Sequence, residues 1–247
     1  MHVFTRSISW RQALRTTLAG LLVVGISLTG AGCSLFGGGD DGGGADDGGD
    51  DDGGDDPTAP AAPSGLTADA QEATVGLSWS SVSDADTYSV YRSTSPTSGV
   101  SGSALDTGIS QTNYTDESAE NGTTYYYRVT AVGPDGNESD GSGEVQSTPF
   151  TNPTGLSGTS GDSQVSLSWD EAAGGETYSV YRATSSFDDV SGIAPLAEGI
   201  SSSSYTDDAA ENGTKYHYRV TTVNPENEES GASGEITKTP FAEPDRP

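Results

Sequence analysis

From residue 60 onward, the hydrophobic positions lie in short runs where apolar and polar residues alternate, and no run keeps the 3.6-residue period of a helix. In the first part of this region the runs lie at 74–79, 87–92, 123–132 and 143–147, with shorter candidates at 65–68, 104–109 and 113–115. Gly, Pro, Asn and Asp residues, which favour turns, separate the runs. Short strands bounded by turns in this way predict an all-β fold, an antiparallel β-sandwich.

The alternation also predicts which side chains fill the sandwich. Residues two apart in a strand share one face of the sheet. We therefore expect one inward set per strand: Val75, Leu77 and Trp79; Tyr88 and Val90; Tyr125, Tyr127, Val129 and Ala131. Large aromatic residues dominate the predicted structural core, namely Trp79, Tyr88 and Tyr125, with Trp169, Tyr178 and Tyr216 in the second half of the chain.

The same pattern occurs twice along the chain. Tyr-Ser-Val-Tyr-Arg at 88–92 recurs at 178–182, and Glu-Asn-Gly-Thr at 120–123 recurs at 211–214. The offset is 90 residues up to position 92 and 91 residues from position 114, so the second copy gained one residue in between. A loop or a sheet edge tolerates such an insertion. The repeat predicts two tandem domains, 60–149 and 150–241, followed by a C-terminal tail at 242–247.

Several motifs in each copy resemble those of fibronectin type III domains. They are Pro-x-x-Leu at 63–66 and 153–156, Trp79 and Trp169, Tyr-x-Val at 88–90 and 178–180, and Gly-Thr-x-Tyr-x-x-x-Val at 122–129 and 213–220. The resemblance implies two immunoglobulin-like sandwiches, with Tyr125 and Tyr216 at a corner where a buried ring ends in a hydroxyl bonded to nearby backbone. Ala119 and Ala210 stand where this family usually has leucine, which predicts a thinner core at that end.

The first 33 residues differ in kind from the rest. Three arginines precede an apolar run at 18–28, as in a secretory signal peptide, and the run is too short to span a membrane as a helix. Thr-Gly-Ala-Gly-Cys at 29–33 resembles the lipobox of bacterial and archaeal lipoproteins, which implies a diacylglyceryl group on Cys33 and a membrane as partner. We expect residues 34–59, rich in Gly and Asp, to be a disordered tether. These features predict an exported protein, lipid-anchored at the outer membrane or cell surface.

The chain is strongly acidic, with 37 Asp and Glu against 10 Lys and Arg and a formal net charge of −27. Nucleic acid is excluded as a partner on this ground, because its binding requires cations that displace the counterions. The composition resembles that of proteins from extreme halophiles, in which concentrated salt screens the self-repulsion of the chain.

Residue types needed for catalysis are scarce. Cys33 is the single cysteine, and after the signal the chain has one histidine, His217, which alternation turns outward to solvent. A lone histidine offers no transition-metal site and no catalytic triad, so we expect no metal, no cofactor and no catalytic residue. Neighbouring acidic pairs such as Asp116/Glu117 and Asp207/Asp208 could serve glycoside hydrolysis, but a closed sandwich provides no deep cleft for it.

The alternation leaves one set of outward residues with binding chemistry. The candidate binding face consists of Tyr91, Tyr126 and Arg128 and, in the second copy, Tyr181, His217 and Arg219. An exposed aromatic ring beside an arginine can stack on a sugar or anchor a protein. Equally, such neighbours pair across strands and stabilise a sheet without any ligand. The expected function is non-catalytic, through adhesion, protein interaction or spacing, with carbohydrate binding at the cell envelope as the alternative.

Overall fold

The computed structural model describes residues 58–243, which contain fourteen β-strands and no helix. The predicted signal, Cys33, most of the tether and the last four residues lie outside the described residues. No helix in the described part of the chain is long and apolar enough to cross a membrane.

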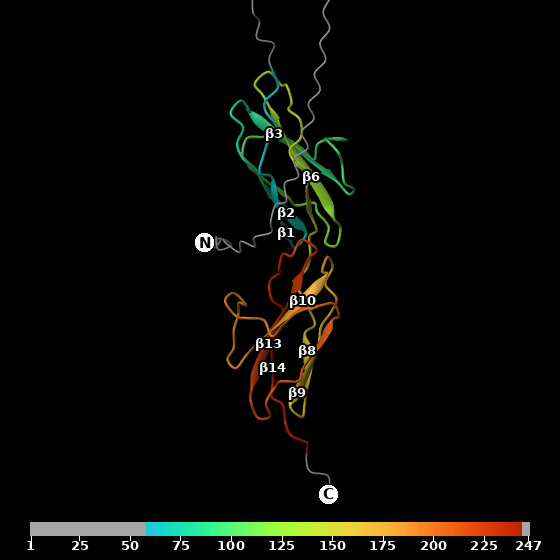
Figure 1. Ribbon diagram of the computed structural model, residues 1–247, viewed down its shortest axis with the longest axis vertical. Helices are drawn as coiled ribbons and strands as arrows, with labels where there is room; N and C mark the ends of the chain where they lie inside the picture. The colour runs from blue at the N-terminus through green and yellow to red at the C-terminus, as the bar shows by residue number, and fades with distance from the viewer. Residues whose placement is uncertain (1–57, 244–247) are drawn as a thin grey trace, which may run out of the picture. The chain divides into compact units, whose positions relative to one another are not determined.

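The first module, residues 60–149, has two antiparallel sheets (Figure 1). One has three strands in the order β1-β2-β5 and the other has four in the order β4-β3-β6-β7. The strands are β1 (Thr67–Gln71), β2 (Thr74–Ser78), β3 (Thr87–Ser93), β4 (Asp106–Ile109), β5 (Asn113–Asp116), β6 (Tyr125–Val132) and β7 (Val145–Ser147). Each of the runs predicted from the alternation is a strand.

The second module, residues 150–241, repeats this arrangement with orders β12-β9-β8 and β11-β10-β13-β14. Its strands are β8 (Ser157–Gly161), β9 (Gln164–Ser168), β10 (Thr177–Ala183), β11 (Ala197–Ile200), β12 (Ser204–Asp207), β13 (Tyr216–Val223) and β14 (Ile236–Lys238). Strands that pair in the middle of the larger sheets, β3 with β6 and β10 with β13, are not consecutive in the chain. The architecture confirms the predicted all-β fold with two tandem sandwiches of the fibronectin type III kind.

Strand ends differ from the expected ones by a few residues. The first strand begins at Thr67 and not at position 65, because Gly65 has a φ of +65°, which is incompatible with a strand. The strand expected at 123–132 begins at Tyr125, after the turn that contains Gly122.

The predicted inward residues form the core of each module. Trp79 is 6% exposed and its ring lies 5.4 Å from that of Tyr88 at 66°, an edge-to-face contact. The equivalent pair, Trp169 and Tyr178, lies at 5.3 Å and the same angle. Val75, Val90, Tyr127 and Val129 have no exposed surface, and their counterparts Val165, Val180, Tyr218 and Val220 are the same. The interior of each sandwich is therefore filled by side chains.

The tyrosine corner is present in both modules. The hydroxyl of Tyr125 accepts a hydrogen bond from the amide of Glu120 at 3.2 Å, and that of Tyr216 accepts one from Glu211 at 3.3 Å. Ala119 is 4% exposed and Ala210 is 1% exposed, so the small residues at this corner belong to the core.

Gly174 lies in the loop before β10, where the segment that joins the modules packs. Its φ is +78°, and a Cβ there would overlap the carbonyl oxygen of Pro149 and press on Phe150. Gly174→Ala is expected to lower the free energy of unfolding by about 2–4 kcal/mol, from backbone strain plus the overlap. Urea unfolding measures the loss.

Gly192 provides the matched control for this substitution. Its φ is +82°, but nothing lies within 4 Å of the position a Cβ would take. Gly192→Ala should therefore cost only the backbone term of about 1–2 kcal/mol. Equal losses in the two variants would show that the contact with Pro149 and Phe150 does not constrain Gly174.

Candidate binding face

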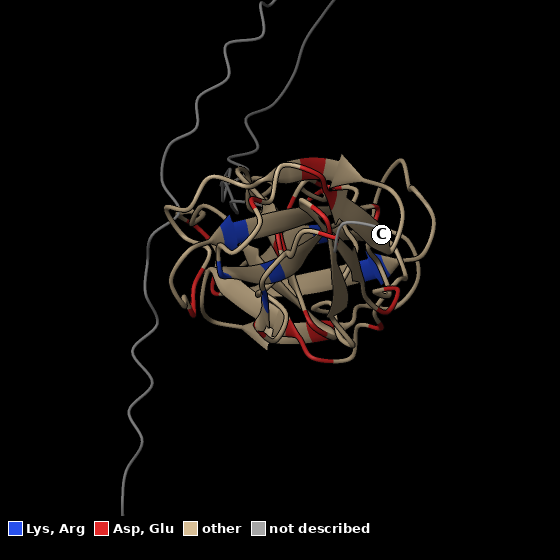
Figure 2. Cartoon of the chain, turned by 90° about the horizontal axis from the view of Figure 1, so that it is seen from below, with Lys and Arg blue, Asp and Glu red and all other residues tan. Residues whose placement is uncertain are grey.

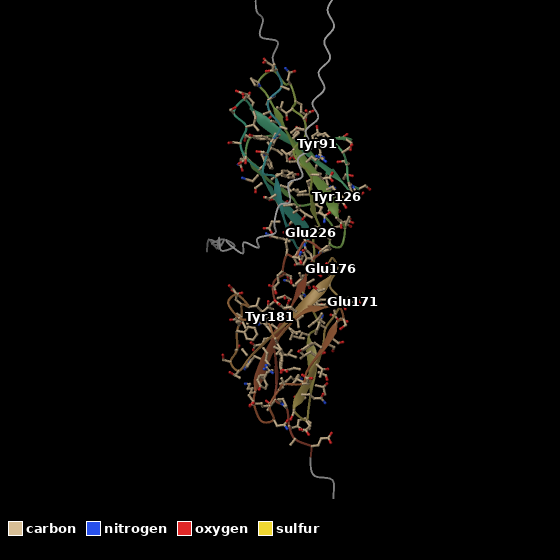
Figure 3. The ribbon with its side chains drawn as sticks, viewed as in Figure 1. Tyr91, Tyr126, Glu171, Glu176, Tyr181 and Glu226 are labelled. Atoms are coloured by element: carbon tan, nitrogen blue, oxygen red, sulfur yellow. The ribbon has the colours of Figure 1, made fainter. Side chains whose placement is uncertain are left out.

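The residues of the predicted binding face lie on the outer surface of the four-stranded sheets. Tyr91 on β3 is paired in register with Arg128 on β6, and Tyr181 on β10 is paired with Arg219 on β13. Tyr126 is two residues from Arg128 on the same strand and shares its face. Figure 3 labels Tyr91, Tyr126 and Tyr181 on these sheets. The structure thus brings the predicted residues together within each module.

The two arginines hold loops against the sheet. The Arg128 guanidinium donates hydrogen bonds to the carbonyl oxygens of Ser142 at 2.6 Å and Thr97 at 2.5 Å, and it lies 3.5 Å from the carboxylate of Glu144. Arg219 donates in the same way to the carbonyl oxygens of Phe187 and Ser233, each at 2.6 Å. Each guanidinium group therefore joins the loop that follows β3 or β10 to the segment that precedes β7 or β14.

Two of the three tyrosines of the face, Tyr91 and Tyr181, are bound to acidic residues through their hydroxyls. Tyr91 donates a hydrogen bond to Glu138 at 2.8 Å, and Tyr181 donates one to Glu229 at 2.6 Å. Burial and the adjacent Glu229 carboxylate raise the pKa of Tyr181 above its ordinary value. Tyr181 is only 5% exposed, so the prediction that its ring is available to a ligand is wrong.

His217 is also covered, contrary to the prediction of a solvated histidine. Alternation does place it on the outer face of β13, but it is 8% exposed and its Nδ1 lies 2.8 Å from Oε1 of Glu235. The same carboxylate accepts hydrogen bonds from the hydroxyl of Ser186 and the amide of Phe187. The loop after β10 thus folds over the histidine, which local alternation cannot reveal.

The hydrogen bonds of Glu235 predict how the stability of the second module depends on pH. The Phe187 amide and then His217 lower the pKa of Glu235 to about 2 from 4.5. A carboxyl whose pKa is lowered by folding contributes stability above its unfolded pKa, and the contribution is lost as the pH falls from 4.5 to about 2. Glu235→Gln is therefore expected to flatten the fall in melting temperature over that interval. Glu211→Gln, at an exposed site of the same module, should leave the slope unchanged.

The outer face of the first module contains a shallow hollow. Its volume is about 10 Å³, and Tyr91, Thr97, Val100, Tyr126 and Arg128 contribute to its lining. Val100 is 38% exposed, one of two large hydrophobic residues in the described chain with that degree of exposure. Tyr91 and Tyr126 are half-buried. The first module therefore keeps part of the predicted face open, whereas the second covers it.

In each module a buried ion pair, which sequence reasoning missed, joins the three-stranded sheet to the four-stranded sheet. Asp116 is 1% exposed and accepts hydrogen bonds from the Arg92 guanidinium at 2.7 Å and the Tyr127 hydroxyl at 2.8 Å. Burial alone would raise the pKa of Asp116, but hydrogen bonds from Ser118, Tyr127 and Arg92 outweigh it and lower the pKa. The guanidinium also lies 4.7 Å from the centroid of the Tyr125 ring.

The second module repeats this cluster with Arg182, Asp207 and Tyr218. Asp207 is likewise 1% exposed, whereas its neighbour Asp208 is exposed. The acidic pairs Asp116/Glu117 and Asp207/Asp208 therefore each separate into one buried and one exposed carboxylate and do not face a common substrate. The sequence did contain a signal for this cluster, because its Arg, Asp and Tyr recur at matching positions of the two copies. Within residues 58–243, no group of three or more His, Cys, Asp or Glu residues could hold a metal ion.

The loop at 224–229 of the second module makes hydrogen bonds with the first. The amide of Ala70 donates to the Glu228 carboxylate at 3.2 Å, and the Asn224 side chain donates to the carbonyl oxygen of Thr148 at 3.2 Å. The Thr148 hydroxyl donates to Glu226 at 3.2 Å. Burial raises the pKa of Glu228 despite the hydrogen bonds it accepts. Some of the polar groups of this loop are therefore already hydrogen-bonded to the first module.

The matching protein family and the curated relatives each cover less than half of the chain. Residues 58–146 match the C-terminal domain of GH85 endohexosaminidases. The chain is 42% identical over 92 residues to an amylopullulanase of Thermoanaerobacter thermohydrosulfuricus and 44% identical over 91 residues to a poly(3-hydroxybutyrate) depolymerase of Ralstonia pickettii. These matches cover 37% and 36% of this chain but only 6% and 17% of the two enzymes.

Solved structures of similar fold include an Fn3-like protein from Clostridium thermocellum, with 32% identity, a TM-score of 0.32, and coverage of 38% of this chain and 97% of that one. A two-domain fibronectin type III segment of chicken tenascin has 19% identity, a TM-score of 0.39, and coverage of 72% and 98%. The first three fibronectin domains of chicken CNTN1 have 18% identity, a TM-score of 0.40, and coverage of 74% and 68%.

Proposed function

We propose that the chain is an exported, lipid-anchored protein of the cell surface whose two modules act without catalysis, in adhesion, protein interaction or spacing. The observation that carries the proposal is the filled interior of each sandwich, in which buried Trp, Tyr and Val side chains leave the outer faces and loops for contact. The acyl group on Cys33 would hold the chain at the membrane, and residues 34–59 would give it reach.

Fractionation of cells that produce the full chain tests the anchor and the location. The chain should partition into detergent with a diacylglyceryl mass on Cys33, and protease added to intact cells should degrade it. Cys33→Ser should release the chain from the membrane fraction. An unmodified Cys33 in a chain that is protected inside intact cells would overturn the proposal.

A carbohydrate-binding accessory role is the second candidate. It is supported by the similarity of the first module to the C-terminal domain of GH85 endohexosaminidases and by the match to an amylopullulanase. Tyr126, half-buried on the open face of the first module, is the ring that would stack on a sugar. Glycan-array binding by the full chain that Tyr126→Ala removes would favour this role. Tyr181→Ala is unsuited to this purpose, because Tyr181 is buried.

We also propose that the acidity adapts the chain to concentrated salt. Figure 2 shows Asp and Glu residues scattered over the described chain, with few Lys and Arg among them. The Debye length falls from about 10 Å at 0.1 M salt to about 3 Å at 1 M, so salt screens this repulsion. The melting temperature is therefore expected to rise between about 0.1 M and about 3 M NaCl. A melting temperature that stays constant over that range would contradict the adaptation.

A further inference from the structure

The loops that follow β3 and β10 are fixed to their sheets through the same backbone contacts. The amide of Thr97 donates to Glu144 at 2.8 Å and its carbonyl oxygen accepts from Arg128 at 2.5 Å. The amide of Phe187 donates to Glu235 at 3.0 Å and its carbonyl oxygen accepts from Arg219 at 2.6 Å. The backbone of residue 97 is thus anchored as that of residue 187 is, and we expect the two side chains to leave equivalent points of the two modules.

The outer faces beside Thr97 and Phe187 differ in exposure. The Phe187 ring lies 5.8 Å from the Arg219 guanidinium carbon, and the face beneath the loop is covered, with Tyr181 at 5% and His217 at 8% exposure. Threonine is too short to cover the same area. In the first module Tyr91 and Tyr126 remain half-buried and Val100 remains 38% exposed around the hollow. The face on which an aromatic ring lies near the arginine is thus the covered one, and the face that has threonine at the equivalent position is the open one.

We propose that the hollow of the first module binds an aromatic side chain of a protein partner, seated over Arg128 as Phe187 is seated over Arg219. The inference rests on the proposed function in protein interaction and gives that function a site and a ligand chemistry. Because the hollow is small and open, the ring lies on the face and does not insert deeply. Contact with the guanidinium, the tyrosine rings and Val100 supplies the attraction.

The polar groups around the hollow favour this occupant over a sugar. The Arg128 guanidinium donates to the carbonyl oxygens of Thr97 and Ser142, and the Tyr91 hydroxyl donates to Glu138. These donors are already used, so the site offers ring contact more than the hydrogen bonds that would orient hydroxyl groups.

Acidic residues beside the hollow restrict the kind of partner segment that fits it. Glu138, bonded to Tyr91, and Asp140 are both exposed. Asp140 adjoins Gly141, at which a Cβ would contact Val100 and Arg128. Acidic side chains on this side of the hollow favour a partner segment in which basic residues flank the aromatic one.

Titration of the full chain with a short peptide tests the site. The probe is acetyl-Lys-Phe-Lys-amide, with acetyl-Lys-Leu-Lys-amide as the matched control, and NMR shifts of Tyr126 and Val100 are the readout. The phenylalanine peptide should shift both residues and bind about tenfold more tightly than the leucine peptide. Equal binding of the two peptides, or no shift at Tyr126 and Val100, would overturn the proposal. Shifts there from methyl glucoside but not from the peptide would assign the hollow to sugars.

Exchange of residue 97 or residue 187 for its counterpart in the other module gives the second test. Thr97→Phe should fill the hollow with its own ring and lower the affinity for the phenylalanine peptide by about tenfold. Thr97→Val loses the hydroxyl without filling the space, so this variant should still bind the peptide. Phe187→Thr should open an additional site in the second module. Undiminished binding by Thr97→Phe would place the peptide elsewhere and refute the inference. If Thr97→Phe fails to fold, the comparison of the two peptides and the additional site expected in Phe187→Thr still test the proposal. None of these outcomes affects the anchoring of Cys33, which is tested separately.

Discussion

Asp116→Ala is expected to lower the free energy of unfolding of the first module by about 3–5 kcal/mol. The substitution removes a carboxylate that is 1% exposed, while the Arg92 side chain, 24% exposed, and the buried Tyr127 hydroxyl lose their partner. A charge left without its partner in a mostly dry site costs more than the pair contributes when intact. Calorimetry of the full chain should show the transition of the first module at a lower temperature and that of the second module unchanged.

Two further variants separate the buried charge from the general acidity of the chain. Glu117→Ala removes the adjacent, exposed carboxylate and should change the stability by no more than about 0.5 kcal/mol. Combining Asp116→Leu with Arg92→Leu and Tyr127→Phe removes the whole cluster and should cost less than Asp116→Ala alone. A loss of equal size for Asp116→Ala and Glu117→Ala would contradict the assignment of Asp116 to a buried ion pair.

Trp79→Ala is expected to destabilise the first module by about 3–5 kcal/mol, the range for deletion of a large aromatic side chain from a core. The indole is 6% exposed and packs edge-to-face on Tyr88. Its removal leaves a cavity between the sheets in addition to the lost burial of apolar surface. Urea unfolding followed by far-ultraviolet circular dichroism measures the loss.

Trp79→Phe and Val100→Ala are the matched comparisons for this variant. The indole N–H of Trp79 has no hydrogen-bond partner in the described structure, so Trp79→Phe loses volume but no bond and should cost less than Trp79→Ala. Val100→Ala, at a position that is 38% exposed, should stay within about 0.5 kcal/mol of the natural chain. If Val100→Ala were as damaging as Trp79→Ala, the predicted core would be wrong.

The sequence predicted where the candidate binding face lies, but it did not predict how exposed the residues of this face are. Period-two alternation correctly placed Tyr91, Tyr126 and Arg128 on the outer face of one sheet. The same reasoning failed for the exposure of Tyr181 and His217, which are 5% and 8% exposed, because alternation fixes the face on which a side chain lies and not what packs over it.

The sequence by itself determined the strands, their inward faces and the duplication, because alternation is a local property and the internal copy repeats it. Tertiary structure alone decided that Asp116 is buried against Arg92, that the loop after β10 covers His217 in the second module, and that Val100 stays exposed in the first. The physical reason is that burial of these groups depends on where distant loops settle on the sheet. The loops after β3 and β10 differ in sequence, with threonine at 97 against phenylalanine at 187, and the faces beside them differ in exposure.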